Sequence, residues 1–322
     1  MVEPRNVFLV GATGTIGRAT ARALRQAGHR VTALIRHRPD GAALLPGITL
    51  REGDPTDPRS IRSDGLRDDR FDVVLSCLAS RTGAPSDAWA VDYRAHMDLL
   101  SAAQAAGIGH MILLSALCVQ KPRLAFQHAK LAFERALAAA PLDHTIVRPT
   151  AFFKSLSGQV MRVRDGKPYL IFGDGRLTAC KPIHDDDLAA YLAHCVTEPD
   201  LRNRTLPIGG PGPALTPRDM GEILFDLTGQ TPRYRAISPR VLSGIAGGLG
   251  VLGRVSPRMA DRAEFARTGH YYATESMLAL DPATGHPDAQ ATPSFGTHHL
   301  RDHYADLLAG RAKDDRGDHA VF

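Results

Sequence analysis

The stretch VFLVGATGTIG at residues 7–17 decides the fold that the sequence predicts. Four apolar residues lead into a glycine loop, and the chain continues as RATARAL, a run that is typical of a helix. A strand, a tight glycine turn and a helix start together form a binding site for a dinucleotide pyrophosphate. Gly11 allows the sharp turn, Gly14 lets backbone N–H groups approach the phosphates, and Gly17 lets the helix pack closely on the sheet. We expect the cofactor to contact Gly11, Thr13, Gly14, Thr15, Ile16 and Gly17.

Strand-like and helix-like runs alternate after this loop. This pattern predicts an α/β protein with an NAD(P)-binding Rossmann fold, a doubly wound parallel sheet. The composition changes after residue 150, which indicates a smaller C-terminal substrate lobe. The expected division is an NADP-binding domain at 1–150, a substrate lobe interleaved with returning Rossmann elements at 151–310, and a disordered tail at 311–322. Further strands are expected at residues 31–35, 48–52, 71–76, 110–115 and 144–148, a short strand and loop at 204–210, and a lid or substrate wall at 241–255.

Two helix starts in the second half carry recognisable capping residues. Asp185, Asp186 and Asp187 are expected to cap a helix that runs through Thr197, because carboxylates at a helix N-terminus are favoured by its dipole. Thr216 is expected to cap another helix.

The second strand ends in Arg36, His37 and Arg38. A Rossmann protein that prefers NAD usually carries a carboxylate there for the ribose 2′-hydroxyl, and no Asp or Glu lies at residues 31–38. Arginine suits a 2′-phosphate because its planar, charged fork binds phosphate in a bidentate manner. We therefore predict NADPH as the cofactor, with Arg36 as its first ligand and Arg38 as its second. Asp54, after the third strand, is a further candidate near the adenine, and a turn role is equally open.

The glycine spacing resembles that of extended and atypical short-chain dehydrogenase/reductases. Typical short-chain reductases carry Tyr-x-x-x-Lys after the fifth strand, and this chain has Phe126-x-x-x-Lys130 there, with Ser115 upstream. The likeness implies that Lys130 binds the nicotinamide ribose and takes part in catalysis. Phenylalanine cannot donate a proton, so we expect reduction of a carbon–carbon double bond or proton delivery by another group. His128 and Lys154 are two candidate proton donors, and the sequence does not rank them.

Composition narrows the class of protein. The chain has 322 residues, 43% hydrophobic residues and a net charge of +5, which is ordinary for a globular protein that binds anions. No basic run interleaved with aromatic residues points to nucleic acid. The four cysteines form no C-x-x-C pair, so we expect reduced thiols and no metal site. The first predicted strand begins close to residue 1 of the sequence, so we expect no leader peptide. We expect a bacterial cytoplasmic protein, with peripheral contact to a membrane surface left open.

Several longer motifs carry a more specific resemblance. They are SCLASR at 76–81, LSA at 114–116, CVQKP at 118–122, VRPTAFFKSL at 147–156, FGDG at 172–175, LPIGGPG at 206–212 and GHYYATESM at 269–277. Through them the sequence resembles the divinyl chlorophyllide/protochlorophyllide 8-vinyl reductases of chlorophyll and bacteriochlorophyll synthesis, in the isoflavone-reductase-like branch of the atypical short-chain reductases. The likeness runs from residue 7 to about residue 308.

This resemblance implies NADPH-dependent reduction of the 8-vinyl group of a magnesium tetrapyrrole, divinyl chlorophyllide or protochlorophyllide, to ethyl. It also suggests aromatic contacts to the flat ring, with core packing as the alternative for each residue. Two other functions remain open at this point: a redox sensor or assembly factor that binds NADP(H) without turnover, and an isoflavone-type reductase of small phenolics. The candidate ring contacts are Phe152, Phe153, Tyr271 and Tyr272.

Overall fold

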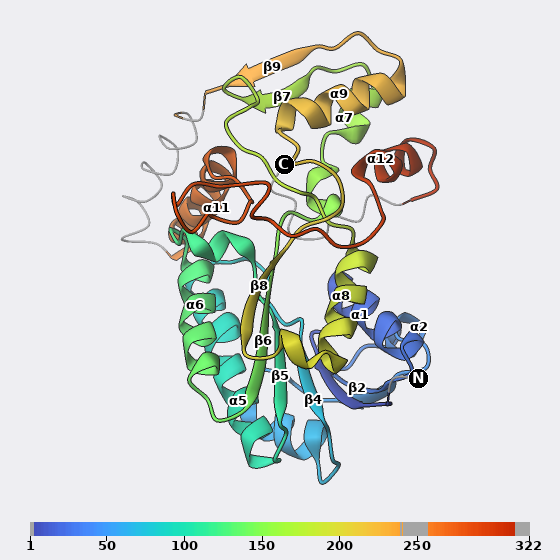
Figure 1. The fold of residues 1–322 in the computed structure, drawn as a ribbon, viewed down its shortest axis with the longest axis vertical. Coiled ribbons are helices and arrows are strands. Elements are labelled where there is room, and N and C mark those ends of the chain that lie inside the picture. Colours follow the sequence, from blue (N-terminus) through green and yellow to red (C-terminus); the bar gives the residue numbers. More distant parts are fainter. Residues whose placement is uncertain (1–2, 239, 241–256, 313–322) are drawn as a thin grey trace.

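The computed structural model describes residues 3–238, 240 and 257–312. Within these residues the chain forms a parallel sheet with the strand order β3-β2-β1-β4-β5-β6-β8 (Figure 1). The chain winds outward from β1 in both directions, which confirms the predicted doubly wound Rossmann sheet. The strands are β1 (Asn6–Val10), β2 (Arg30–Ile35), β3 (Thr49–Glu52), β4 (Val73–Ser76), β5 (His110–Leu114), β6 (Asp143–Pro149) and β8 (Arg204–Ile208).

Helices cover both faces of the sheet. On one face lie α1 (Thr15–Gln26) and α8 (Asp185–Thr197), which pack against each other. On the other lie the π-helix η1 (Ile61–Leu66), α5 (His96–Ala105) and α6 (Ala125–Ala138). The remaining helices are α2 (Gly41–Leu44), α3 (Pro58–Ser60), α4 (Pro85–Ala88), η2 (Trp89–Ala95), η3 (Leu117–Gln120), η4 (Phe153–Leu156), α7 (Val160–Arg164), η5 (Pro199–Leu201), α9 (Pro217–Thr228), α11 (Pro257–Thr274) and α12 (Leu300–Leu308).

The central strand shows why the sheet is buried on both sides. Successive side chains of a strand point to opposite faces. Val7 and Leu9 of β1 pack into the core under α1 and α8, whereas Phe8 and Val10 pack into the core under η1, α5 and α6. All four side chains are fully buried. The continuous apolar run that preceded the glycine loop in the sequence is therefore the signature of a parallel strand covered by helices.

A smaller part of the molecule lies beyond the end of the sheet at which β6 finishes (Figure 1). There β7 (Tyr169–Phe172) pairs in parallel with β9 (Tyr234–Ile237). Val163 of α7, Leu224 of α9 and Tyr304 of α12 share a buried core in this part. Because the chain enters it directly from β6 through η4, this part stands over the carboxyl edge of the sheet, where parallel sheets bind their ligands.

Two predicted helix starts can be compared with the structure. α9 begins as predicted: the Thr216 hydroxyl accepts a hydrogen bond from the Asp219 N–H, and the Asp219 carboxylate accepts one from the Thr216 N–H. α8 differs, because its N-cap is His184, whose Nδ1 accepts a hydrogen bond from the Asp186 N–H at 3.2 Å. The expectation that the three acidic residues themselves cap α8 was wrong, since they occupy its first turn.

Two sequence-based expectations fall on parts of the chain that the structure does not describe. The predicted lid at 241–255 lies outside the described residues. So do residues 313–322 of the predicted disordered tail.

Candidate functional site

The glycine loop that joins β1 to α1 has the geometry of a dinucleotide-binding turn. Gly11 has φ of +74°, and a Cβ there would lie 2.5 Å from the backbone of Cys77 and Leu78. A Cβ on Gly17 would lie 2.1 Å from the Gly11 carbonyl oxygen, so Gly17 permits packing of the helix on the loop itself rather than on a strand. A Cβ on Gly14 would meet only the Gly11 oxygen, at 3.5 Å. Of these three glycines, Gly14 is the one with open space beside it, where a ligand can approach.

The first turn of α1 has the features of an anion-binding site. Its N-cap, Gly14, offers no side-chain acceptor, and the turn contains no acidic residue. Its N–H groups and the positive end of the helix dipole are therefore available to phosphate oxygens. Thr13 and Thr15 are half-buried beside this turn, whereas the side chain of Ile16 packs into the core.

Two arginines follow the carboxyl end of β2, and they differ in whether another side chain binds them. Arg36 is exposed, and no described residue engages it in a hydrogen bond or ion pair. Arg38 is held by Asp40 through two hydrogen bonds, Nε to Oδ1 at 2.6 Å and Nη2 to Oδ2 at 2.8 Å. His37 lies 2.9 Å from the Glu52 carboxylate. Arg36 is thus the guanidinium that can bind a 2′-phosphate without first giving up a partner.

Asp54, the candidate near the adenine, is exposed and already used by its own turn. Its Oδ1 accepts hydrogen bonds from the N–H and the hydroxyl of Thr56, at 2.9 and 2.7 Å. This is the Asx-turn geometry that short acidic side chains form locally. A cofactor contact for Asp54 stays a prediction.

Lys130 of α6 lies at the carboxyl edge and is buried. Its Nζ is 3.0 Å from Oδ1 of Asp92, a residue of η2 that is itself 1% exposed. The same Oδ1 accepts a hydrogen bond from the Ser80 N–H, and the other oxygen, Oδ2, has no hydrogen-bond partner among the described residues. Asp92 therefore holds the ammonium of Lys130 in place and retains one unused acceptor.

The serine upstream of this frame is also engaged. The Ser115 hydroxyl donates to the Glu134 carboxylate, which is paired with Arg148. Ser115 is consequently a strand-end hydroxyl whose hydrogen bond is made within the protein.

The four candidate ring contacts differ in accessibility. Phe153 is 2% exposed, and its ring packs against those of His184 and His303. Tyr271 is 3% exposed, and its hydroxyl donates to the Cys118 carbonyl at 2.8 Å. Phe152 and Tyr272 are half-buried. The Tyr272 hydroxyl lies 3.8 Å from the Cys118 Sγ, so α11 is tied to η3, close to α6. Burial raises the pKa of both tyrosines, which keeps their hydroxyls protonated at neutral pH.

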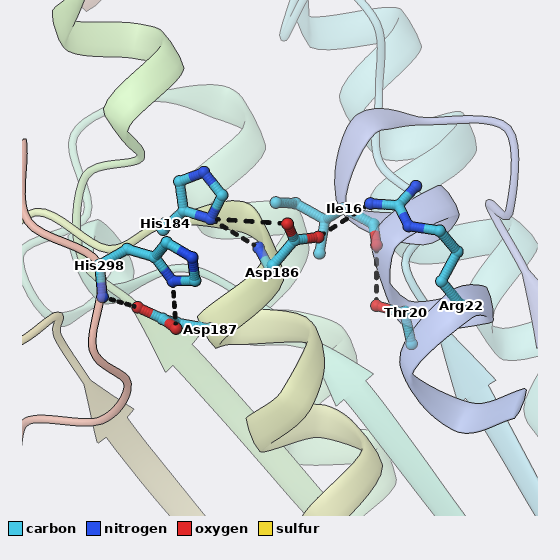
Figure 2. Close-up of polar contacts among 7 residues, drawn as sticks. All are labelled: Ile16, Thr20, Arg22, His184, Asp186, Asp187 and His298. Atoms are coloured by element: carbon cyan, nitrogen blue, oxygen red, sulfur yellow. Dashed lines mark hydrogen bonds and ion pairs between the residues drawn. The ribbon is translucent and has the colours of Figure 1, made fainter. Parts of the chain in front are cut away.

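Two acidic residues in the first turn of α8 have partners on neighbouring elements (Figure 2). Asp186 pairs with Arg22 of α1 at 2.8 Å. Asp187, which is buried, accepts hydrogen bonds from the backbone N–H and Nδ1 of His298 at 3.0 and 2.7 Å. Asp185 differs from them in one respect, because its buried Oδ1 has no hydrogen-bond partner within the described ranges.

Other features of the described residues add little to the site. A hollow of about 650 Å³, lined by Gly107, Gly109, Leu142 and Asn203 among others, lies at the amino ends of β5, β6 and β8. It is therefore at the opposite edge of the sheet from the glycine loop. Across the described ranges, no cluster of three or more His, Cys, Asp or Glu side chains is arranged to hold a metal ion. No described helix combines the length and apolar character needed to cross a membrane.

Comparison with known proteins gives both a family match and close relatives. A family model for NAD(P)H-binding matches residues 11–199. The divinyl chlorophyllide a 8-vinyl-reductase of Zea mays is 44% identical, over 98% of this chain and 82% of that protein. The Arabidopsis thaliana protein of the same name is 43% identical, over 97% and 79%. The photosystem II assembly factor Ycf39 of Synechocystis is 28% identical, over 63% and 62%.

Solved structures share the fold at low identity. An NADPH-dependent quinone oxidoreductase from Escherichia coli, complexed with NADPH, aligns with a TM-score of 0.68 and 19% identity, over 94% of this chain and 99% of that one. AtPrR2 with NADP⁺ and (+)pinoresinol aligns with a TM-score of 0.69 and 19% identity, over 96% and 100%. These likenesses support the Rossmann fold.

The predicted location requires correction. The 8-vinyl-reductases of Zea mays, Oryza sativa, Cucumis sativus and Arabidopsis thaliana are all named as chloroplastic, which points to a plastid rather than a bacterial cytoplasm. The prediction rested on the position at which the sequence begins, and that position carries no information about the compartment.

Proposed function

The chain belongs to the divinyl chlorophyllide a 8-vinyl-reductase family, and from this premise we propose that it reduces the 8-vinyl group of a divinyl chlorophyllide or protochlorophyllide to ethyl with NADPH. The observation that carries the proposal is the 43–45% identity to four such reductases over 97–98% of the chain. The substrate is accordingly a magnesium tetrapyrrole, which brings its own metal.

The residues present fit the cofactor. The open side of the loop at Gly14 and the uncapped turn of α1 suit a pyrophosphate, and Arg36 suits a 2′-phosphate. When bound, NADPH supplies the hydride for the reduction. Lys130, fixed by Asp92, orients the nicotinamide ribose, so that the reactive face meets the pigment in a constant geometry.

The side chain at position 126 agrees with this reaction. Reduction of a carbonyl needs an acid close to the oxygen, and Phe126 supplies none. In a conjugated vinyl group, the negative charge that follows hydride addition spreads over the macrocycle. The protein then needs only to position the pigment, exclude competing reactions and admit one proton.

We assign the two parts of the chain different tasks. Residues 1–150 hold the cofactor, and residues 151–310 contribute the pigment-facing lobe together with returning elements of the sheet. Of the four candidate ring contacts, Phe152 and Tyr272 are half-buried, so each has exposed surface that can contact a flat ring. Phe153 and Tyr271 support them from within the core.

The other functions considered from the sequence receive less support. The Ycf39 assembly factors match at 26–28% identity over 63–64% of the chain, well below the reductases. The likeness to the structure with bound pinoresinol is at 19% identity and shows the fold alone.

The proposal is tested by an anaerobic assay of the purified protein with divinyl chlorophyllide and NADPH, with NADH in parallel. We expect conversion to the monovinyl pigment with NADPH. Absorption spectra and chromatography monitor the conversion. A protein that binds NADPH and leaves the pigment unchanged would instead be a sensor or assembly factor.

A further inference from the structure

We propose that Lys154 is a ligand of the cofactor pyrophosphate and that Asp185, a half-buried acid, is its counter-group, which takes up a proton when the pyrophosphate binds. The proposal rests on the use of NADPH by this chain. It deepens the cofactor site by adding two residues that lie outside the glycine loop.

Lys154 reaches the loop from a distant part of the chain. It lies in η4, directly after β6, and its Nζ donates a hydrogen bond to the Thr15 hydroxyl at 2.7 Å. Thr15 is the first residue of α1, whose N-terminal turn has no acidic residue and no side-chain cap. An ammonium beside the positive end of a helix is unfavourable on its own, since helix N-termini attract anions and repel cations. The arrangement becomes favourable when a phosphate lies between the two.

Asp185 is the acidic residue whose charge interacts with that of Lys154. It opens α8, which packs along α1, and Figure 2 shows the first turn of α8 facing α1. Its neighbour Asp186 is already paired with Arg22. Asp185 itself has a buried Oδ1 without a hydrogen-bond partner in the part of the chain that the structure describes. One oxygen of this carboxylate is therefore available to carry a proton.

The charges around Asp185 explain its titration. Burial raises the pKa of its carboxyl to about 6. Lys154 from η4, and Arg18 and Arg22 from α1, act in the opposite direction and lower this pKa. Asp186, on its own helix, raises it. Near pH 6 the carboxyl is thus poised between its two forms, whereas an ordinary Asp is fully ionised.

Binding of a pyrophosphate adds negative charge beside this carboxyl and raises its pKa further. Below about pH 6 the group is protonated with and without cofactor, so affinity does not depend on it. Above that pH the free protein must take up a proton to bind, so the dissociation constant rises with pH, at most tenfold per unit. The proton stays on Asp185, so the carboxyl is neutral and the Lys154 ammonium pairs with the phosphate oxygens.

Lys154 and Lys130 lie at different parts of the cofactor site. Lys130 approaches the carboxyl edge from α6, on the opposite face of the sheet from α1. Lys154 contacts the phosphate-binding turn of α1. We therefore assign Lys130 to the nicotinamide ribose and Lys154 to the pyrophosphate, and we do not assign Lys154 as proton donor.

The test measures binding rather than turnover. Dissociation constants for NADPH and for ADP-ribose, which has the pyrophosphate but no nicotinamide, are determined by fluorescence and calorimetry with the full chain. Lys154→Met should weaken both ligands by about 10- to 100-fold, as expected for a lost charge-assisted hydrogen bond, and Lys154→Arg should restore part of the loss. Lys167→Met removes an exposed lysine of the same lobe and should change neither constant.

A second arm uses pH and does not depend on the lysine variant folding. In the wild-type protein, NADPH affinity should fall between pH 6 and 8, and Asp185→Asn should flatten this profile and bind more tightly than wild type at pH 8. Unchanged affinities in Lys154→Met, or an identical pH profile in Asp185→Asn, would overturn the proposal. A wild-type protein that binds no NADPH would instead contradict the proposed function.

Discussion

Replacement of Lys130 by methionine is expected to lower kcat/KM for pigment reduction by about 100-fold or more, because misplacement of a bound reactant by about 1 Å costs this much. The same change should destabilise the fold. Lys130 is 9% exposed and faces a carboxylate that is 1% exposed, Asp92. Removal of one partner of a buried ion pair leaves the other charge uncompensated and costs about 3–5 kcal/mol.

A double variant separates these two effects. Asp92→Asn combined with Lys130→Met removes both charges, so the free energy of unfolding should recover most of the loss seen in Lys130→Met alone. Activity should not recover, because the group that orients the ribose is still missing. Denaturant titrations and steady-state kinetics on the single and double variants measure the two quantities. A double variant with wild-type turnover would remove Lys130 from the mechanism.

Replacement of Arg36 by alanine is expected to weaken NADPH binding by about 10- to 100-fold and to leave NADH binding unchanged. The reason is that a 2′-phosphate occurs only in NADPH, and that Arg36 is exposed at the end of β2 without a partner among the described residues. The dissociation constants of the two dinucleotides, measured side by side, check the expectation.

Arg38→Ala serves as the matched control for Arg36→Ala. Arg38 must give up its two hydrogen bonds to Asp40 before it can reach a phosphate, so its removal should have the smaller effect on NADPH. Equal weakening of NADPH and NADH in Arg36→Ala would contradict the assignment. If Arg38→Ala weakened NADPH binding more than Arg36→Ala, Arg38 would be the ligand of the 2′-phosphate.

The sheet and the glycine loop could be predicted because their signals are local. The apolar run before Gly11 is a buried strand, and the positive φ of Gly11 follows from the turn that joins it to α1, whereas Gly17 packs on the loop and not, as predicted, on the sheet. The start of α9 was equally local, since Thr216 and Asp219 cap it within one turn. Propensity, periodicity and turn chemistry all act within a few residues.

The charge partners of the site could not be predicted in the same way. Asp92 meets Lys130 from a different helix, and Lys154 meets Thr15 across 139 positions of sequence. No periodic pattern encodes such contacts, because they depend on how the elements pack. The aromatic residues show a related limit, since a sequence cannot tell that Phe153 is buried in the core while its neighbour Phe152 keeps exposed surface.

Transfer of deuterium from labelled cofactor to pigment tests the central claim most directly. The protein is incubated anaerobically with divinyl chlorophyllide and NADPH that carries two deuterium atoms at C4, in ordinary water. The account predicts a monovinyl product that contains one deuterium, located in the new 8-ethyl group by mass spectrometry and NMR, with the second hydrogen supplied by solvent. A product without deuterium, or pigment that is not reduced although NADPH binds, would contradict it.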